Sequence, residues 1–255
     1  MIGVPITSFF GLLPTEEKRT PELSSRLTSV MTIPDYQDFL NEQERYYDEL
    51  SADYAEWAKS FENRDAPESV RQKWRSDNEM VENAVRYNLV GSGPVLEVGC
   101  GLSRVPKDYD EGLVYLLDCS RKMLSKAMKS RDPRRFIPIN ARSCALPFKE
   151  ETFSTILSIQ LLSHQSDPLC RRSIKEMQRV LTHGGTLFIS DSMAPFPSHA
   201  IREGDFQIRR LKNGSIYRVY KKYRSPKELI SFIAHSKIEV SEGSQFFFNI
   251  SCRKE

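Results

Sequence analysis

The sequence predicts an α/β fold, in which a mostly parallel sheet carries helices on both of its faces. After Gly91, short apolar runs alternate with helical patterns, which indicates right-handed β-α-β units. The chain has 255 residues, 39% of them apolar, which is enough for one large core with an appended element. The first apolar run ends in "GCG", and glycines suit the tight turn that must follow a strand at this point.

The N-terminal region precedes the sheet. Residues 1–34 carry four prolines among Ser and Thr, and this composition favours irregular structure. Aromatic and apolar residues then recur at helical spacing from Tyr36 to Phe61, which predicts a first helix. A second helix is expected from Glu68 to about Leu89. We therefore expect residues 1–90 to form an irregular segment and a helical lid, and residues 91–255 to form the core.

Five apolar runs of the core predict its strands. They are "PVLEVG", "GLVYLLD", "RFIPIN", "FSTILSIQ" and "GGTLFISD". Ser120 is a suitable N-cap for the helix after the second strand, and Pro168 suits the first turn of a helix that opens at Asp167. This order of strands and helices is the basis for the predicted parallel sheet.

The C-terminal part departs from that alternation. Two strand-like runs flank Asn213-Gly214, which is the strongest short hairpin signal, so a β-hairpin insertion is expected at about 205–223. A helix is then expected in "SPKELISFIAHS", and "SQFFFNISC" predicts a last strand. An antiparallel strand at the end of a parallel sheet is a common arrangement.

Composition excludes several classes of protein. The formal net charge of +3 is small for this length and does not indicate nucleic-acid binding. The five cysteines are scattered and form no Cys-x-x-Cys pair, so neither a disulfide framework nor a metal site is expected, and a reducing cytoplasm fits best. No apolar segment approaches the length that crosses a bilayer, so no membrane partner is expected.

The ends of the first two strands carry the residues that point to a ligand. Ligands of open parallel sheets bind beyond the carboxyl ends of the strands, where the strand order reverses. Here Glu97 and the "GCG" turn end the first strand, and Asp118, whose carboxylate can accept both hydroxyls of a ribose, ends the second. A dinucleotide needs a third glycine for its pyrophosphate, but Ser103 stands there and the next glycine is Gly112. A different nucleoside ligand is therefore expected.

Four motifs carry a resemblance to a known family. "VLEVGCG", "LLDCSRKML", "ALPFKEETFSTILSIQLLSHQSDP" and "RVLTHGGTLFISD" resemble, in order and spacing, the motifs of class I S-adenosylmethionine-dependent methyltransferases over about residues 94–191. The upstream "YYDELSADYAEW" is similar to the Tyr-Asp helix of small-molecule members, in particular the ubiquinone- and menaquinone-biosynthesis-like group. The resemblance implies a Rossmann-like sheet of seven strands with an antiparallel last strand, and S-adenosylmethionine as cofactor.

The resemblance also implies which residues bind the cofactor. Gly99 and Gly101 would contact its methionine part, Asp118 its ribose hydroxyls, and Gln160 would lie beside the sulfonium. Tyr47 and Tyr54 would cover it from the lid, although an aromatic stripe is also typical of plain core packing. The full set is Glu97, Gly99, Cys100, Gly101, Asp118, Cys119, Met123, Ser143, Cys144, Gln160, Leu161, Tyr47 and Tyr54.

Several positions depart from the family pattern, among them Ser154 in place of the usual Asp after the Phe of the fourth strand, which is interpreted as structural. Ser103 replaces the usual third glycine, as in a subgroup that includes protein-lysine methyltransferases, and Pro106 is expected to shorten the following helix to a turn or two. The acid that reads the adenine amino group is absent, and either Asn140 or Arg142 stands there. Asn140 could accept that hydrogen bond and Arg142 could not. Otherwise, the backbone near Ser143 and Cys144 would recognise the adenine.

His164, on the loop after the fourth strand, is the candidate general base, and a capping or packing histidine is the alternative. The basic run from Arg209 to Lys227 could hold an anionic acceptor, but a solvated sheet edge protected by Lys and Arg is the favoured interpretation. We expect methyl transfer to an O, N or C atom of a small molecule. A homodimer is the expected oligomeric state. A macromolecular methyltransferase, such as a protein-lysine enzyme, and a non-catalytic binding module are the alternatives.

Overall fold

The computed structural model describes residues 36–59, 66–89, 93–193, 202–203, 205–234, 236–241 and 245–255. The predictions for residues 1–34 and for the helical end at Phe61 lie outside these residues. Within the described part, no helix has both the length and the apolar character needed to cross a bilayer.

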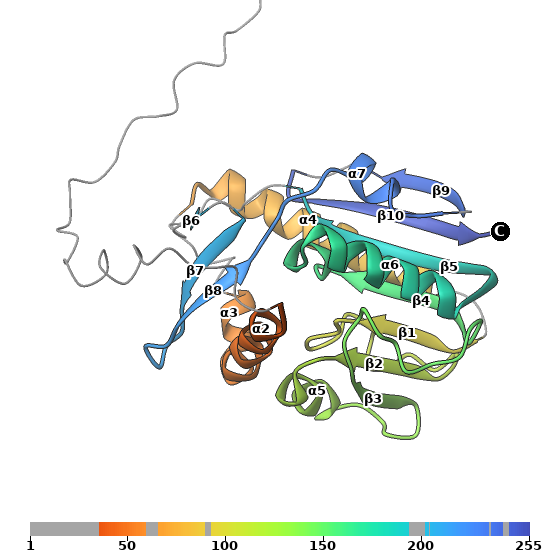
Figure 1. The fold of residues 1–255 in the computed structure, drawn as a ribbon, viewed down its shortest axis with the longest axis horizontal. Coiled ribbons are helices and arrows are strands. Elements are labelled where there is room, and N and C mark those ends of the chain that lie inside the picture. Colours follow the sequence, from red (N-terminus) through yellow and green to blue (C-terminus); the bar gives the residue numbers. More distant parts are fainter. Residues whose placement is uncertain are drawn as a thin grey trace, which may run out of the picture. The chain divides into compact units, whose positions relative to one another are not determined.

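The main sheet has seven strands among the described residues, in the order β3-β2-β1-β4-β5-β10-β9 (Figure 1). Strands β1 to β5 pair in parallel, whereas β10 is antiparallel to both of its neighbours. The strands are β1 (Val95–Val98), β2 (Val114–Asp118), β3 (Phe136–Asn140), β4 (Phe153–Ile159), β5 (Leu181–Ser192), β9 (Ser236–Ser241) and β10 (Phe247–Lys254). The predicted fold class is confirmed. Strand β1 has β2 on one side and β4 on the other, so the strand order reverses at β1.

Two separate cores cover the two faces of this sheet. Neighbouring strand residues alternate between them, so that Val95 and Leu116 face one core, while Leu96 and Leu117 face the other. Helices α4 (Glu68–Asn88) and α5 (Arg121–Met128) contribute to the first core, and α6 (Asp167–Val180) and α7 (Pro226–Ile230) to the second. Ser120 caps α5 as predicted, accepting from Met123 N at 3.1 Å, and Pro168 lies in the first turn of α6.

The first helix was predicted to be continuous, but in the structure it is broken. It divides into α2 (Tyr36–Leu50) and α3 (Tyr54–Lys59), with a turn at residues 51–53. Ser51 Oγ donates to the Asp48 carbonyl at 2.7 Å, a local bond that competes with helix continuation, and Asp53 N bonds the Leu50 carbonyl in a tightened last turn.

The predicted hairpin is present as β7 (Phe206–Arg210) and β8 (Ile216–Tyr220), joined at Gly214, which has a φ of 89°. A short strand β6 (Arg202–Glu203) extends it to a second sheet of three strands among the described residues. Val219 of β8 packs with Tyr46 and Leu50 of α2. The solvated-edge interpretation of the basic run is wrong for part of it, because Lys221 and Arg224 are only 6% and 3% exposed.

Candidate active site

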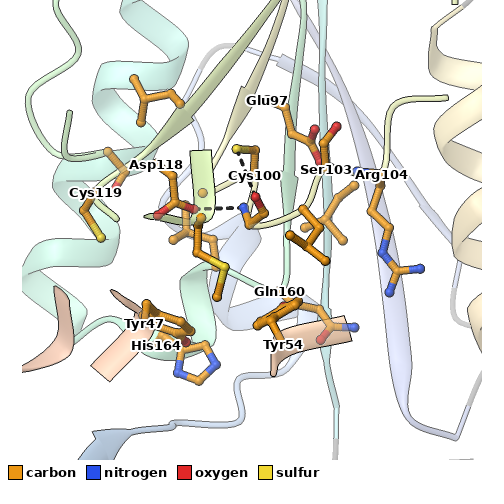
Figure 2. A pocket seen from close by; sticks show the side chains of 18 of the residues that line it. Tyr47, Tyr54, Glu97, Cys100, Ser103, Arg104, Asp118, Cys119, Gln160 and His164 are labelled. Atoms are coloured by element: carbon orange, nitrogen blue, oxygen red, sulfur yellow. Dashed lines mark hydrogen bonds between the residues drawn. The ribbon is translucent and has the colours of Figure 1, made fainter. Parts of the chain in front are cut away.

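A cavity of about 620 Å³ lies at the carboxyl ends of β1, β2 and β4. All the residues predicted for the site, both the cofactor set and His164, line it. Figure 2 shows them in two groups, with Asp118 and Glu97 on opposite sides of Cys100, and with Tyr47, His164, Tyr54 and Gln160 facing them. Sites for small molecules and cofactors occupy roughly 300–1,000 Å³, so the cavity is large enough for one such ligand with space beside it.

The loop after β1 takes the backbone shape of a glycine-rich turn without its third glycine. Gly99, Gly101 and Ser103 have φ values of 70°, 51° and 70°. Ser103 therefore adopts the left-handed conformation that glycine adopts most easily, and its Oγ accepts from Val105 N at 3.2 Å. The short helix predicted near Pro106 is absent. Residues 99–113 form turns and bends instead, because Pro106 removes a donor that helix continuation would need.

Asp118 joins the tips of the first two strands. Its Oδ2 accepts from Gly101 N at 2.9 Å and its Oδ1 from Ser120 N at 2.9 Å. Asp118 is 8% exposed. Burial raises the pKa of its carboxyl group above the usual range, although the two backbone hydrogen bonds act to lower it. Each carboxylate oxygen has a second acceptor position, so Asp118 can still accept from ligand hydroxyls.

Glu97 presents an unsatisfied oxygen on the other side of the loop. Its Oε1 accepts from Arg104 N at 2.9 Å, whereas its buried Oε2 has no hydrogen-bond partner. Burial raises the pKa of Glu97, and this effect outweighs the nearby Ser103, Arg104 and Arg131, which act to lower it. A buried acceptor without a donor is costly, and a ligand ammonium would satisfy it. The residues on this side therefore fit the methionine end of S-adenosylmethionine.

The adenine side differs from the expectation for Asn140. Asn140 Nδ2 donates to the carbonyls of Asp118 and Cys119, at 3.1 and 2.7 Å, and its Oδ1 accepts from Arg121 Nε at 2.9 Å. Asn140 is thus turned to the backbone and is absent from the cavity lining, so it does not replace the missing acid. Arg142 lines the cavity instead and donates to Asn41 Oδ1 at 3.0 Å.

The end of β4 carries local strain. Gln160 has a φ of 54°, which is uncommon for a residue other than glycine, and its backbone N bonds the Ser190 carbonyl at 2.7 Å. Such strain is concentrated at functional sites, where the surrounding structure holds it in place. A short 3₁₀ helix follows at Leu162–His164, an element that the sequence analysis missed. Asp191 fixes it by accepting from Ser163 N at 2.8 Å.

His164 faces the cavity, but both of its ring nitrogens contact protein groups. Nδ1 lies 2.8 Å from the Tyr220 carbonyl and must donate, because a carbonyl oxygen can only accept. Nε2 therefore carries the lone pair, and it lies 3.5 Å from Lys221 Nζ. Burial, together with Lys221 and Arg209, lowers the pKa of His164 well below its usual value. This geometry argues against the predicted role as general base.

Tyr47 and Tyr54 supply hydroxyl groups that remain protonated. Burial raises the pKa of Tyr54, and raises that of Tyr47 well above its usual value, so both act as neutral donors at neutral pH. The Tyr47 ring meets His164 edge-on, with centroids 6.0 Å apart. The Tyr54 hydroxyl lies close to Gly101, 3.7 Å from where a Cβ would stand. The tyrosines therefore lie at the site as well as in the core.

Helix α4 contributes a stripe of lining residues that the sequence analysis did not assign. Trp74, Asn78, Glu82 and Arg86 recur every fourth residue, and this spacing on the predicted second helix was the available signal. Arg104 links the stripe to the loop after β1, because its guanidinium donates to Glu82 Oε1 at 3.2 Å and to Asn78 Oδ1 at 3.3 Å.

Comparisons with known proteins concern the family match and the fold. Residues 96–189 match the family described as "Methyltransferase domain". The fold is similar to that of the DhpI-SAM-HEP complex, with a TM-score of 0.64, 18% identity, and coverage of 84% of this chain and 97% of that one. It is also similar to an S-adenosylmethionine-dependent methyltransferase from Mesorhizobium loti, with a TM-score of 0.52, 18% identity, and coverage of 68% and 96%. No curated protein matches the chain by sequence.

Residues 96–189 therefore match a methyltransferase domain, and the chain has a fold that S-adenosylmethionine-dependent methyltransferases share. The structural likenesses, at these low identities, show the fold alone.

Proposed function

We propose that the protein transfers a methyl group from S-adenosylmethionine to a small molecule. The observation that carries the proposal is the cover over the cavity: Leu40, Gln43, Tyr47 and Tyr54, all from α2 and α3, belong to its lining. Gln43 Nε2 also donates to the His164 carbonyl at 3.1 Å, which ties this lid to the loop after β4. A covered cavity suits a small acceptor, whereas a polymer needs an open groove.

The cofactor-binding residues proposed from the resemblance keep their roles in this proposal. Asp118 would accept from the ribose hydroxyls, and Glu97 Oε2, which lacks a donor, would accept from the methionine ammonium. The backbone near Ser143 and Cys144 would receive the adenine edge. The cofactor supplies an electrophilic methyl group on a sulfonium. Gln160 would lie beside the sulfonium. Leu161 and Tyr47 would cover the cofactor and exclude water from the space where the acceptor lies opposite the leaving sulfur.

The partition of transferred label tests the small-molecule proposal. The protein is incubated with methyl-labelled S-adenosylmethionine and an extract of the source cells, separated by size into small molecules and macromolecules. We expect label in the small-molecule fraction only. Label in the protein or RNA of the other fraction would instead support the macromolecular alternative, and none in either, with cofactor bound, would support the non-catalytic module. The ubiquinone- and menaquinone-like group, the cytoplasmic location and the homodimer stay predictions.

Arg104 is proposed to hold the methionine carboxylate. Its guanidinium lies in the lining next to Glu97, and its contacts to Glu82 and Asn78 are long enough for a carboxylate to compete with them. Replacement by alanine is expected to weaken binding of S-adenosylmethionine by about tenfold or more, since a charge-assisted hydrogen bond contributes roughly 1.5–3 kcal/mol. Calorimetry measures this.

Decarboxylated S-adenosylmethionine is the control for that prediction, because it lacks only the group that Arg104 would bind. Its affinity is expected to be the same for the wild-type protein and for Arg104→Ala. Equal losses for both ligands would mean that Arg104 supports the shape of the loop and does not bind the carboxylate.

A further inference from the structure

Two cations from the C-terminal part of the chain lie behind one wall of the cavity. We call the residues Tyr47, Tyr54, Gln160 and His164 the acceptor wall (Figure 2). Lys221 is 6% exposed, lies 3.5 Å from His164 Nε2, and donates to Ser163 Oγ at 2.6 Å. Arg209 donates to the Tyr46 hydroxyl at 3.0 Å, on the residue next to Tyr47.

The field of these two cations reaches the acceptor wall. After burial, Lys221 and Arg209 are the groups that lower the pKa of His164. Arg209 also opposes the burial that raises the pKa of Tyr47. Lys221 is buried, so its charge is screened less than a charge on the surface would be.

The carboxylates of the cavity lining lie elsewhere. Among the described residues these are Glu97 and Asp118 at the loop after β1, and Glu82 on α4. The acceptor wall offers hydroxyl and amide donors instead. In the described part of the chain, the Tyr47 hydroxyl has no hydrogen-bond partner, so its donor is available to a ligand. Hydrogen-bond donors in a positive field match a negatively charged oxygen.

We propose that the acceptor presents an oxyanion, such as a carboxylate or phosphate oxygen, to the acceptor wall, and that this oxygen receives the methyl group. This inference rests on the proposed function and names the chemistry of its acceptor. Transfer breaks the C–S bond, whose electron pair stays on sulfur, and forms a C–O bond from the oxyanion's lone pair. The positive charge of the sulfonium and the negative charge of the oxyanion are both neutralised, and no proton is released.

An oxyanion fits the wall better than an amine or a phenol does. A phenol or an ammonium must give up a proton, and His164 has both ring nitrogens next to protein groups. A neutral amine would become a cation beside Lys221 and Arg209. An oxyanion needs no base, which agrees with the contacts of His164.

The two cations are expected to act on acceptor binding. The oxyanion loses charge as the C–O bond forms, so a positive field stabilises the bound acceptor more than the transition state. Removing one cation should therefore weaken binding of an oxyanion and leave the affinity for the cofactor product unchanged.

The experiment uses the full chain saturated with S-adenosylhomocysteine. Acetate, inorganic phosphate and acetamide are titrated at constant ionic strength, and binding is followed through the NMR signals of Tyr47 and His164. Acetamide is the neutral counterpart of acetate, and the comparison of acetate with phosphate distinguishes a carboxylate from a phosphate acceptor. We expect acetate or phosphate to bind about tenfold more tightly than acetamide.

Charge-removing variants test whether Arg209 and Lys221 cause the preference for an anion. Arg209→Gln is expected to weaken binding of the preferred anion by about threefold to tenfold, whereas Arg209→Lys should keep most of the affinity. Arg210→Gln is the matched control, since Arg210 is the next residue on β7, is exposed, and loses the same charge. Lys221→Gln provides a second removal of charge if Arg209→Gln does not fold.

Equal binding of acetate and acetamide by the wild-type protein would overturn the inference, and this comparison needs no variant. Equal effects of Arg209→Gln and Arg210→Gln would overturn it as well. Failure of the protein to bind S-adenosylhomocysteine is a different result, because it would contradict the proposed function and not the acceptor's charge.

Discussion

Replacement of Asp118 by alanine is expected to lower the affinity for S-adenosylhomocysteine by about thirtyfold to several-hundred-fold. Two ligand hydroxyls would lose an ionised, buried acceptor, which costs on the order of 2–4 kcal/mol. Isothermal titration calorimetry measures the loss. No other replacement of a single side chain should weaken cofactor binding as much, because Asp118 is the carboxylate that joins the tips of β1 and β2.

Asp118 also accepts from the backbone of Gly101 and Ser120, so part of the loss could come from a disturbed loop. The unfolding temperature of the ligand-free variant separates the two effects. Asp108→Ala, which removes the same charge from an exposed position of the loop, is the control and should bind normally. Normal affinity in Asp118→Ala would show that the second strand does not hold the ribose.

Replacement of Gly99 by alanine is expected to lower the free energy of unfolding by about 2–5 kcal/mol. Its φ of 70° costs a residue with a Cβ about 1–2 kcal/mol. The added Cβ would also lie 2.7 Å from Leu161 Cδ1, and such overpacking costs about 1–3 kcal/mol more. Because both residues line the cavity, cofactor binding should fall together with stability.

Gly184 provides a matched control for Gly99. It has a φ of 69°, and nothing lies within 4 Å of the position of its added Cβ. Gly184→Ala should therefore show the cost of backbone strain alone. In a double-mutant cycle, Leu161→Ala should recover the part of the Gly99→Ala cost that comes from overlap. Equal losses of stability at Gly99 and Gly184 would contradict the contact with Leu161.

The sequence predicted the sheet well because its signals are local. Short apolar runs, the N-cap at Ser120 and the Asn-Gly turn at Gly214 each act within a few residues, and the structure confirms them. Strand β9 was not predicted from an apolar run, because its apolar residues alternate with charged ones and its pairing with β10 is a tertiary contact. The break between α2 and α3 coincides with a side-chain bond of Ser51, which periodicity does not show.

The site was predictable only as far as motifs reach. The loop after β1 and Asp118 meet as expected from their positions at neighbouring strand ends. The contacts of Lys221 and Arg209 with the site join residues far apart in the sequence, so a charge run alone suggested a solvated edge. Likewise, the backbone bonds of Asn140 and the Tyr220 contact of His164 appear only once the fold is formed.

A crystal structure with S-adenosylhomocysteine would show directly whether the tips of β1 and β2 hold the cofactor. We predict the ribose hydroxyls within hydrogen-bond distance of Asp118, the amino-acid end along Gly99 to Arg104, and the sulfur facing Tyr47 and Gln160. The ligand bound at another place, or well-folded protein that does not bind it, would contradict the account.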